Sequence, residues 1–180
     1  CYGDGGAIMT NDDALGVLLH KIANHGQSVR YYHDVVGCNS RLDSIQAVVL
    51  SAKLPHLDDY CDARRKVADY YDSAFAEVDA LETPFRASYT THAFHQYTLK
   101  VKDGRRDVLK QYLDEQKIPN MIYYPVPLYK QEAFKASSNG LEYLDNTEEL
   151  CKEVISLPIH TEMDEAQLAY ICDKVKAFFK

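Results

Sequence analysis

A glycine-rich run, Tyr2-Gly3-Asp4-Gly5-Gly6-Ala7, leads into the apolar residues Ile8 and Met9. Glycine is used where the backbone needs a positive φ, or where a phosphate or another backbone must come close. The run therefore predicts a tight loop that enters a short strand over residues 7–10. Asp4 is expected to shape this loop rather than to act as an acid.

A second candidate site lies where a polar, tyrosine-rich stretch meets a predicted helix. Asn39 and Arg41 stand at the N-terminus of a helix expected to begin at Ser40 or Asp43. Free N–H groups and the helix dipole converge at such a point and favour an anion. The residues by themselves favour a structural interpretation instead, in which Asn39 caps the helix and Arg41 is a solvated surface charge.

Two further groups of residues could contact a ligand. Tyr123 and Tyr124 precede Pro125 and offer phenolic donors on a rigid loop, which suits sugar hydroxyls; the alternative is a strand end that packs two aromatic rings. His25 and His33 flank the tyrosine-rich stretch. A lone histidine is more often structural than catalytic, so His33 is assigned only a substrate-side role.

Composition excludes several classes of protein. The 180 residues carry a net charge of −7 with scattered Lys and Arg, which argues against nucleic-acid binding. Five dispersed cysteines have no zinc spacing, so we expect reduced cytosolic thiols and no metal site. No apolar run approaches the ~20 residues of a membrane helix. These features predict a cytoplasmic protein without a membrane segment.

The N-terminal region is predicted to be mostly helical, because apolar residues recur there at helical spacing. Its expected elements are a helix capped by Asn11 or Asp12 and ended by Gly26, a long loop over residues 27–39, a helix as far as Leu54, and a helix from Pro55 to about residue 78. The break at Leu54 follows from Pro55, because the residue before a proline avoids helical geometry and proline suits the first helical position.

After Pro84 strand-like and helical stretches alternate. We expect strands over residues 95–101, 118–124 and 155–159, and helices over residues 104–116, 146–153 (capped by Asn146 or Thr147, with Glu148 or Glu149 completing the cap) and from Asp164 onward. This alternation is typical of a small α/β domain with helices packed on a sheet. A domain boundary is therefore predicted between residues 82 and 83.

Five motifs occur in order along the chain: Tyr2-Gly3-Asp4-Gly5-Gly6-Ala7, Asn24-His25-Gly26, Gly37-Cys38-Asn39-Ser40-Arg41-Leu42-Asp43, Tyr124-Pro125-Val126-Pro127-Leu128 and Ser156-Leu157-Pro158-Ile159-His160. Together they resemble the DegT/DnrJ/StrS family of nucleotide-sugar aminotransferases, which use pyridoxal 5'-phosphate (PLP). The resemblance implies an α/β fold, the C-terminal part of a fold-type I PLP aminotransferase. Residues 1–82 would end the large PLP-binding domain, with an interface loop and linking helices, and residues 83–180 would form the small C-terminal α/β domain.

The resemblance also assigns roles to individual residues. In a homodimer Asn39 would reach the phosphate of the neighbouring subunit's PLP, from a loop that lies at the two-fold interface. Arg41 would bind the carboxylate of a uronic-acid sugar, since a guanidinium binds carboxylates bidentately. Tyr123, Tyr124 and His33 would contact the substrate.

Catalytic groups of the family are not expected in this chain. The resemblance places the Schiff-base lysine, and the carboxylate that holds the pyridinium nitrogen, upstream of Cys1. The chain is therefore expected to be part of a longer protein and to be inactive on its own. Many family members have histidine at the positions of Tyr123 and Tyr129, so hydrogen bonding rather than proton transfer is expected of these tyrosines.

The resemblance predicts transfer of an amino group from an amino acid, with glutamate as the expected donor, to a keto-sugar nucleotide in surface polysaccharide biosynthesis. Residues 39–43 and 123–128 look closest to enzymes that aminate C3 of UDP-linked 3-keto-uronic sugars. Two alternatives are a PLP-dependent sugar dehydratase, in which histidine replaces the lysine, and a non-catalytic regulatory relative. The residues before Cys1 would distinguish them.

Overall fold

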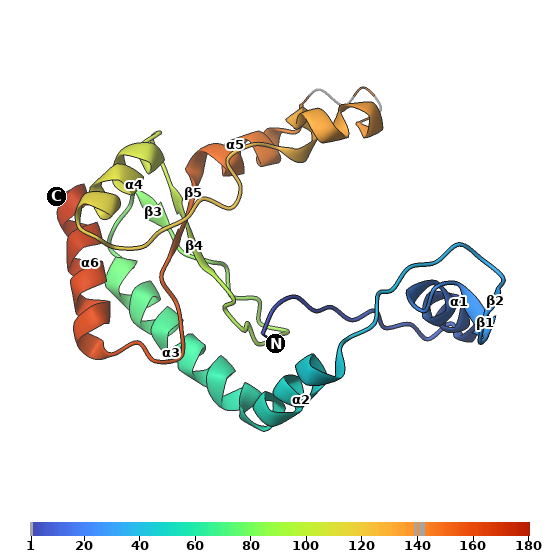
Figure 1. Ribbon diagram of the computed structural model, residues 1–180. Coiled ribbons are helices and arrows are strands. Elements are labelled where there is room, and N and C mark those ends of the chain that lie inside the picture. Colours follow the sequence, from blue (N-terminus) through green and yellow to red (C-terminus); the bar gives the residue numbers. More distant parts are fainter. Residues whose placement is uncertain (1, 139, 141–142) are drawn as a thin grey trace. The chain divides into compact units, whose positions relative to one another are not determined.

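The computed structural model describes residues 2–138, 140 and 143–180, and the chain divides into two units, Cys1–Leu57 and Asp58–Lys180. The N-terminal unit contains α1 (Asp13–Ala23), β1 (Gln27–Val29), β2 (Tyr32–His33), α2 (Ser44–Lys53) and η1 (Leu54–His56), a 3-10 helix (Figure 1). The C-terminal unit contains α3 (Leu57–Phe75), β3 (Leu81–Glu82), β4 (Tyr97–Val101), α4 (Arg106–Glu115), the 3-10 helices η2 (Leu128–Lys130) and η3 (Glu132–Ser137), α5 (Asp145–Glu153), β5 (Val154–Leu157) and α6 (Glu165–Phe179).

Local sequence explains the start of α1. The Asp12 carboxylate accepts a hydrogen bond from the backbone N–H of Leu15 at 3.0 Å, as predicted for an N-cap. The helix ends at Ala23, before Gly26, because the Gly26 N–H turns back to the Lys21 carbonyl at 2.7 Å. The N-terminus of α1 is therefore set by a side chain and its C-terminus by a backbone turn.

Two predictions for the N-terminal unit are wrong. Residues 7–10 form no strand, because a strand needs a neighbouring backbone and none within the described residues pairs with them; Ile8 and Met9 are 76% and 92% exposed. Residues 27–39 are not a loop throughout, since β1 and β2 form an antiparallel hairpin there. Tyr31 has a φ of 73° in the turn of this hairpin, a backbone geometry that no hydrophobic pattern reveals.

The predicted break before Pro55 is confirmed in that α2 ends at Lys53, but Leu54 keeps helical dihedral angles (φ −55°, ψ −39°), so the expected departure of this residue from helical geometry is wrong. Residues Leu54–His56 form η1, and α3 then runs to Phe75, three residues short of the predicted end at residue 78. The start of α2 also agrees with prediction, because Asp43 occupies its N-cap position, although its carboxylate makes no capping hydrogen bond.

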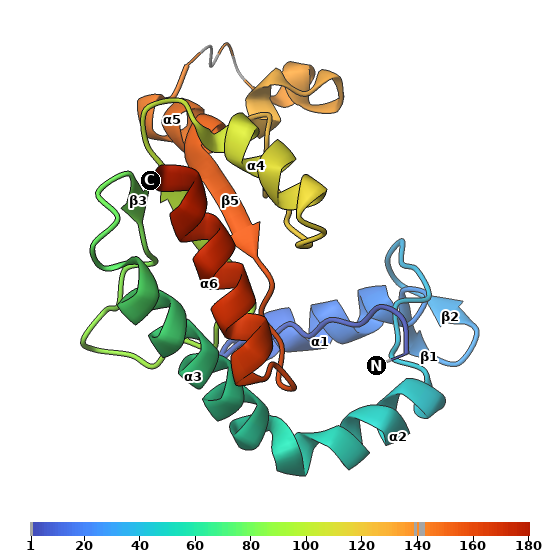
Figure 2. The same ribbon diagram turned by 90° about the vertical axis from the view of Figure 1, so that its left-hand side faces the viewer.

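The C-terminal unit is built on a three-stranded antiparallel sheet in the order β3-β4-β5. Alternate residues of β4 (Tyr97, Leu99 and Val101) are fully buried, and all four residues of β5 are buried. The core contains apolar side chains from α3, β4, α4, β5 and α6. In Figure 2 the strand β5 is seen between α6 and α4, and α4 packs against both.

Two predictions for this unit need correction. Residues 118–124 form no strand: only Met121 pairs, in a single bridge with Ser156, because Pro119 has no N–H to donate to a ladder. The N-cap of α5 is Leu144, without the predicted capping side chain. By contrast, Asp164 caps α6 in a full capping box with Gln167. The two-residue β3 and the helices η2 and η3 were not predicted.

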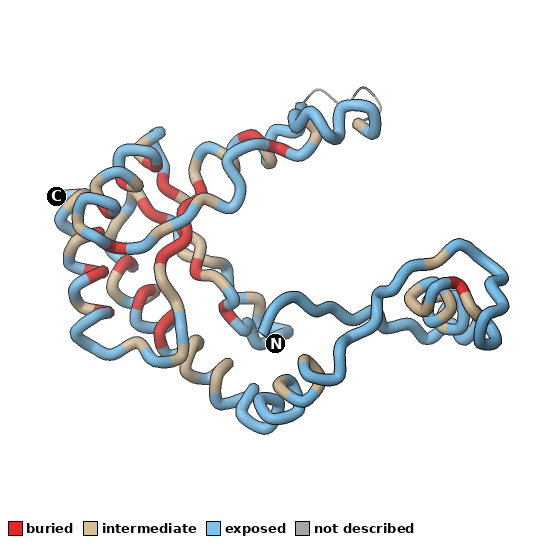
Figure 3. The backbone as a smooth tube through the Cα atoms, viewed as in Figure 1, coloured by how far each residue is buried: buried red, intermediate tan, exposed pale blue. Residues whose placement is uncertain are grey.

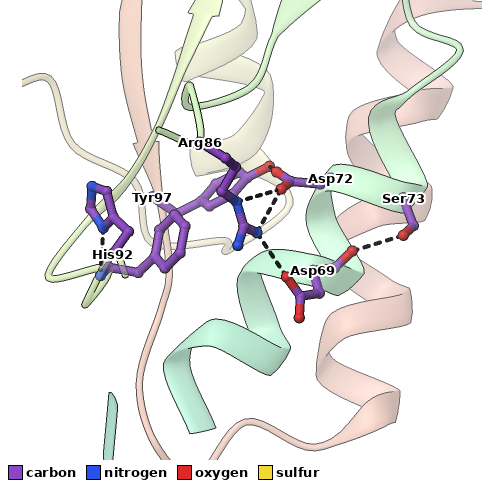
Figure 4. Close-up of polar contacts among 7 residues, drawn as sticks. Asp69, Asp72, Ser73, Arg86, His92 and Tyr97 are labelled. Carbon is purple, nitrogen blue, oxygen red and sulfur yellow. Dashed lines mark hydrogen bonds and ion pairs between the residues drawn. The ribbon is translucent and has the colours of Figure 1, made fainter. Parts of the chain in front are cut away.

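A polar network joins the segment before β4 to α3 (Figure 4). The Arg86 guanidinium binds the carboxylates of Asp72 at 2.6 Å and Asp69 at 2.9 Å, and its carbon lies 4.4 Å from the centre of the Phe94 ring. The buried Tyr97 donates its hydroxyl to Asp72 at 2.6 Å. The irregular segment between β3 and β4 is therefore held against a helix at both of its ends.

The two units differ sharply in burial (Figure 3). Of the described residues 2–57, only Gly26 is buried. Large apolar side chains of this unit are exposed instead: Leu15, Val17, Leu18, Ile22, Val29, Val36, Leu42, Ile45, Val48 and Leu54. Exposed apolar surface on this scale marks contact with other protein. The helices of the N-terminal unit therefore lack a core within the described residues.

The first unit ends at Leu57, whereas the sequence analysis placed a domain boundary between residues 82 and 83. Val67, Tyr71 and Phe75 of α3 pack into the C-terminal core, which explains why α3 groups with that unit. Among the described residues, no helix is long and apolar enough to cross a membrane.

Candidate functional site

Two glycines allow the chain to cross itself beside the end of α1. A Cβ on Gly37 would lie 2.2 Å from the Gly26 nitrogen and 2.6 Å from the Ile22 carbonyl oxygen. A Cβ on Gly26 would lie 1.8 Å from the Val35 carbonyl oxygen, and Gly26 also has a φ of 75°. Only glycine fits at either position, so Gly26 and Gly37 of the sequence motifs are required by the close approach of the two backbone segments.

The crossing holds the segment that carries Asn39. The Cys38 N–H donates to the Ile22 carbonyl at 2.8 Å, and the Ser40 N–H donates to the Ala23 carbonyl at 2.9 Å. Asn39 itself forms a bridge with Asn24. The backbone of Asn39 is therefore fixed to the C-terminus of α1, although its side chain is exposed.

Asn39 and Arg41 are brought together as a pair of donors. The Arg41 Nε donates to the Asn39 Oδ1 at 3.0 Å. This bond orients the amide so that its NH2 group faces away from the guanidinium, whose terminal N–H groups also stay available. Asp43, rather than Asn39, lies at the N-cap of α2, so the interpretation of Asn39 as a helix cap is wrong.

Arg41 also lines a groove of about 740 Å³ within the N-terminal unit. Its other lining residues come from the glycine-rich loop, α1 and the start of α2, and include Asp4, Gly5, Gly6, Leu19, His20, Ser40, Asp43 and Gln46. The Asp4 carboxylate accepts the Gly5 N–H at 2.9 Å and so shapes the loop, as the sequence predicts. The groove therefore combines the Arg41 cation and the Asp4 and Asp43 carboxylates with a glycine-rich backbone that a ligand can approach closely.

Gln46 is a residue of this groove that the sequence analysis missed. Its Oε1 accepts the Tyr2 N–H and its Nε2 donates to the Tyr2 carbonyl, both at 2.7 Å. The Gln46 amide therefore binds the glycine-rich loop through both backbone polar groups of one residue, the N–H and the C=O of Tyr2. No pattern in the sequence distinguishes Gln46 from an ordinary polar helix residue, because its partner lies 44 positions away.

His33 belongs to the hairpin of the same unit. Its Nδ1 lies 2.8 Å from the His25 carbonyl oxygen, which can only accept, so Nδ1 carries the proton and Nε2 of the neutral ring is an acceptor. His25 has a φ of 62°. His33 is thus oriented by the backbone and does not contact Asn39 or Arg41.

Tyr123 and Tyr124 belong to the C-terminal unit and form a separate group. They are joined by a cis peptide bond, their ring centres are 5.6 Å apart in an edge-to-face arrangement, and they are 40% and 71% exposed. They follow no strand, so the alternative of a packed strand end is wrong. Their hydroxyl groups form no hydrogen bond with the described residues and remain available as donors.

A buried carboxylate contacts two residues that follow this second group in sequence. Tyr129 and Lys130 both contact Glu148 of α5, which is only 6% exposed. In the sequence Glu148 is a possible capping residue in the first turn of a helix. Its burial depends on tertiary packing and could not be found from the sequence.

Comparisons with known proteins agree with these features. The model of the DegT/DnrJ/EryC1/StrS aminotransferase family matches residues 1–176, and the chain belongs to this family. It is 42% identical to the pleiotropic regulatory protein of Geobacillus stearothermophilus, over 99% of this chain and 48% of that protein. It is 39% identical to the UDP-2-acetamido-2-deoxy-3-oxo-D-glucuronate aminotransferase of Pseudomonas aeruginosa, over 96% of this chain and 46% of that protein.

A solved structure confirms the predicted α/β aminotransferase fold class. The crystal structure of DesV from S. venezuelae in complex with a ketimine intermediate matches all of this chain and 48% of that chain, with a TM-score of 0.92 and 33% identity. The chain therefore spans about half the length of the curated relatives and solved structures it matches.

The donors at residues 39–41 fit the cofactor of this family. Aminotransferases of the family depend on PLP, whose phosphate is an anion that needs several N–H donors. The exposed Asn39 amide is one such donor, on a backbone segment fixed by hydrogen bonds. No group of three or more metal-ligating side chains lies together in the described part of the chain.

Proposed function

We propose that the protein containing this chain is a PLP-dependent aminotransferase that moves an amino group from an amino acid, glutamate, to a keto-sugar nucleotide. The match of residues 1–176 to the family model carries this proposal. When bound, PLP supplies the electron sink for the chemistry, and the protein supplies binding and orientation. The residues of this chain would then bind the cofactor phosphate and the substrate.

Asn39 and Arg41 would bind two different anionic groups, the cofactor phosphate and a substrate carboxylate. Asn39 would donate its NH2 group to the phosphate of the PLP bound to a second copy of the chain. Arg41, held by its Nε on the Asn39 oxygen, would direct its terminal N–H groups at a substrate carboxylate. His33, Tyr123 and Tyr124 would contact the sugar through hydrogen bonds.

The substrate class follows from Arg41 together with the relatives. The Pseudomonas aeruginosa relative is named for a UDP-linked 3-oxo-glucuronate, a sugar with a carboxylate, and Arg41 lines an open groove. We therefore infer a UDP-linked 3-keto-uronic sugar as substrate and surface polysaccharide biosynthesis in the cytoplasm as the context. The domain boundary between residues 82 and 83 belongs to the same proposal, with residues 1–82 in the large domain.

The assembly would be a homodimer with the hairpin at its two-fold interface. Tyr31 and Tyr32 are 73% and 71% exposed, and the Arg30 guanidinium lies 4.9 Å from the centre of the Tyr31 ring. Aromatic residues and arginine are enriched in interfaces, and a two-fold axis lets one loop complete both sites.

The substrate assignment is tested with a panel of UDP- and dTDP-linked keto-sugars with and without a carboxylate. Arg41→Ala should lower kcat/KM for carboxylated sugars about 10- to 100-fold, since a charge-assisted bond contributes about 1.5–3 kcal/mol. Activity with neutral keto-sugars and PLP retention should not change. Arg41→Lys keeps the charge without the bidentate geometry and should recover only part of the loss.

Each other outcome of the panel has a definite meaning. An equal loss with neutral sugars would remove Arg41 from specificity. Elimination of water from the sugar in place of amino transfer would identify the dehydratase alternative. Failure to act on any sugar, with PLP fully bound, would favour the regulatory alternative.

The dimer is tested by sedimentation of the whole protein with Tyr31→Asp and Tyr32→Asp together. Charges at these positions should weaken the dimer and PLP retention in parallel. Tyr89→Asp is the matched control, because Tyr89 is 89% exposed but lies in the C-terminal unit. An intact dimer that keeps its cofactor would contradict the interface assignment.

A further inference from the structure

Glu148, in the first turn of α5, is a buried carboxylate with partners from another segment. Its Oε1 accepts a short hydrogen bond from the Tyr129 hydroxyl and forms an ion pair with the Lys130 ammonium. The Tyr129 hydroxyl in turn accepts the Leu144 N–H at 3.2 Å. These contacts join η2 to the beginning of α5.

The charges of this cluster are mutually stabilising. A carboxylate is costly to bury unless it is paired and hydrogen-bonded. Lys130 first, and Tyr129 second, lower the pKa of Glu148 below its ordinary value, and the same ion pair raises the pKa of Lys130. Glu148 is therefore an anion near neutral pH, and the η2–α5 connection consists of charge-assisted bonds, which are the stronger class.

The same cluster holds one end of the segment that carries Tyr123 and Tyr124. At the other end Met121 and Ser156 of β5 exchange two backbone hydrogen bonds, of 3.2 Å and 2.7 Å. With the described part of the chain, residues 122–126 make no other backbone–backbone hydrogen bond. Because α5 runs directly into β5, both ends of the segment are attached to one continuous stretch of chain.

The linker between the tyrosine pair and η2 is stiff. Pro125 and Pro127 fix their own φ angles and restrict the residues before them. The Lys130 N–H donates to the Pro127 carbonyl at 3.0 Å, which ties the linker to η2. A displacement of Tyr129 would therefore move Tyr124 rather than be absorbed by a flexible loop.

We propose that Glu148 is a positioning residue, which through Tyr129 and Lys130 sets the place of Tyr123 and Tyr124 for recognition of the sugar. This inference rests on the proposed function, which assigns the two tyrosines to the nucleotide-sugar substrate. Glu148 does not contact the substrate in this scheme. Its effect is on binding of the sugar and not on binding of the amino-acid donor.

The test measures both half-reactions in the whole PLP-loaded protein, with glutamate and with the best nucleotide sugar from the panel above. Glu148→Ala and Tyr129→Phe should each raise KM for the sugar up to about tenfold, the change expected when displaced tyrosines lose one neutral hydrogen bond to the sugar. KM for glutamate, kcat of its half-reaction and PLP content should stay at wild-type values. Tyr129→His retains a donor to the carboxylate and should recover most of the sugar affinity.

Glu149→Ala is the matched control, because Glu149 is the next residue of α5 and is exposed. It should leave both KM values unchanged. Equal increases in KM for sugar and glutamate, or a loss of thermal stability without any change in KM for the sugar, would overturn the positioning role. A wild-type protein that acts on no nucleotide sugar would instead overturn the proposed function, so the two failures are distinguishable.

Discussion

Three tyrosines of the C-terminal unit allow the contribution of a single hydroxyl group to the free energy of unfolding to be separated from that of the packed ring. Tyr97 is fully buried and donates to the Asp72 carboxylate at 2.6 Å. Tyr71 is also fully buried and donates to a neutral acceptor, the Pro158 carbonyl, at 2.8 Å. Tyr112 is half-buried and packs its ring against the core, and its hydroxyl forms no hydrogen bond with the described residues. Replacement by phenylalanine removes one oxygen atom in each case and keeps the ring.

The expected losses of unfolding free energy form a graded series. A hydrogen bond to a charged group contributes about 1.5–3 kcal/mol and a neutral one about 0.5–1.5 kcal/mol. Tyr97→Phe should therefore lower the free energy of unfolding by about 2 kcal/mol, Tyr71→Phe by about 1 kcal/mol, and Tyr112→Phe by less than about 0.5 kcal/mol. The Tyr97 loss is the largest because the Asp72 oxygen that it leaves is partly buried and loses its donor.

Urea unfolding followed by far-UV circular dichroism measures the series. With a slope of about 2 kcal/mol/M, Tyr97→Phe should shift the midpoint by about 1 M while the slope stays constant. Burial first, and the bond to Asp72 second, raise the pKa of Tyr97 above its ordinary value, so the hydroxyl stays protonated and the shift should be the same at pH 6 and pH 9. Equal shifts for Tyr97→Phe and Tyr112→Phe would refute the assignment of the loss to the hydroxyl bond.

Three further predictions concern the glycine crossing, the cysteines and the buried carboxylate. Gly37→Ala should abolish protection of the neighbouring loop amides in hydrogen exchange, whereas Gly6→Ala, whose Cβ would meet nothing within 4 Å, should not; equal protection in both would contradict the steric argument. Burial raises the pKa of the Cys172 thiol to about 12, so at pH 8 maleimide should label the exposed Cys38 far faster than it labels Cys172. Mass spectrometry measures both rates, and equal rates would show that Cys172 is accessible. The pKa of Glu148 is lowered in the folded state, so its contribution to stability is present above pH 4.5 and is lost as the pH falls through the folded-state value. Glu148→Gln should therefore weaken the dependence of the melting temperature on pH below pH 4.5. The same pH dependence in the variant and the wild type would contradict the ion pair.

Local chemistry explains what the sequence predicted correctly. Asp12 and Asp164 cap their helices through hydrogen bonds to residues three positions away, and Pro55 interrupts a helix by its own covalent structure. These effects act over one helical turn, so residue type and spacing suffice to predict them. The ordered motifs also identified the family correctly, because they combine several local requirements at once.

The same reasoning explains the errors in secondary structure. Residues 7–10 have the composition of a strand but lack a partner among the described residues, and residues 118–124 contain Pro119 and pair only at Met121. A strand forms only when a second backbone accepts its hydrogen bonds. That condition depends on tertiary structure and is absent from any single stretch of sequence.

The sequence by itself determined the helices, the family and the residue types that could bind an anion or a sugar. Tertiary structure decided which of them meet: Arg41 with Asn39, Gln46 with Tyr2 over 44 positions, and the buried Glu148 with Tyr129 and Lys130. The physical reason is the distance along the chain over which each interaction acts. Caps, turns and proline effects act within one turn of chain, whereas burial and long-range hydrogen bonds exist only after the elements have packed.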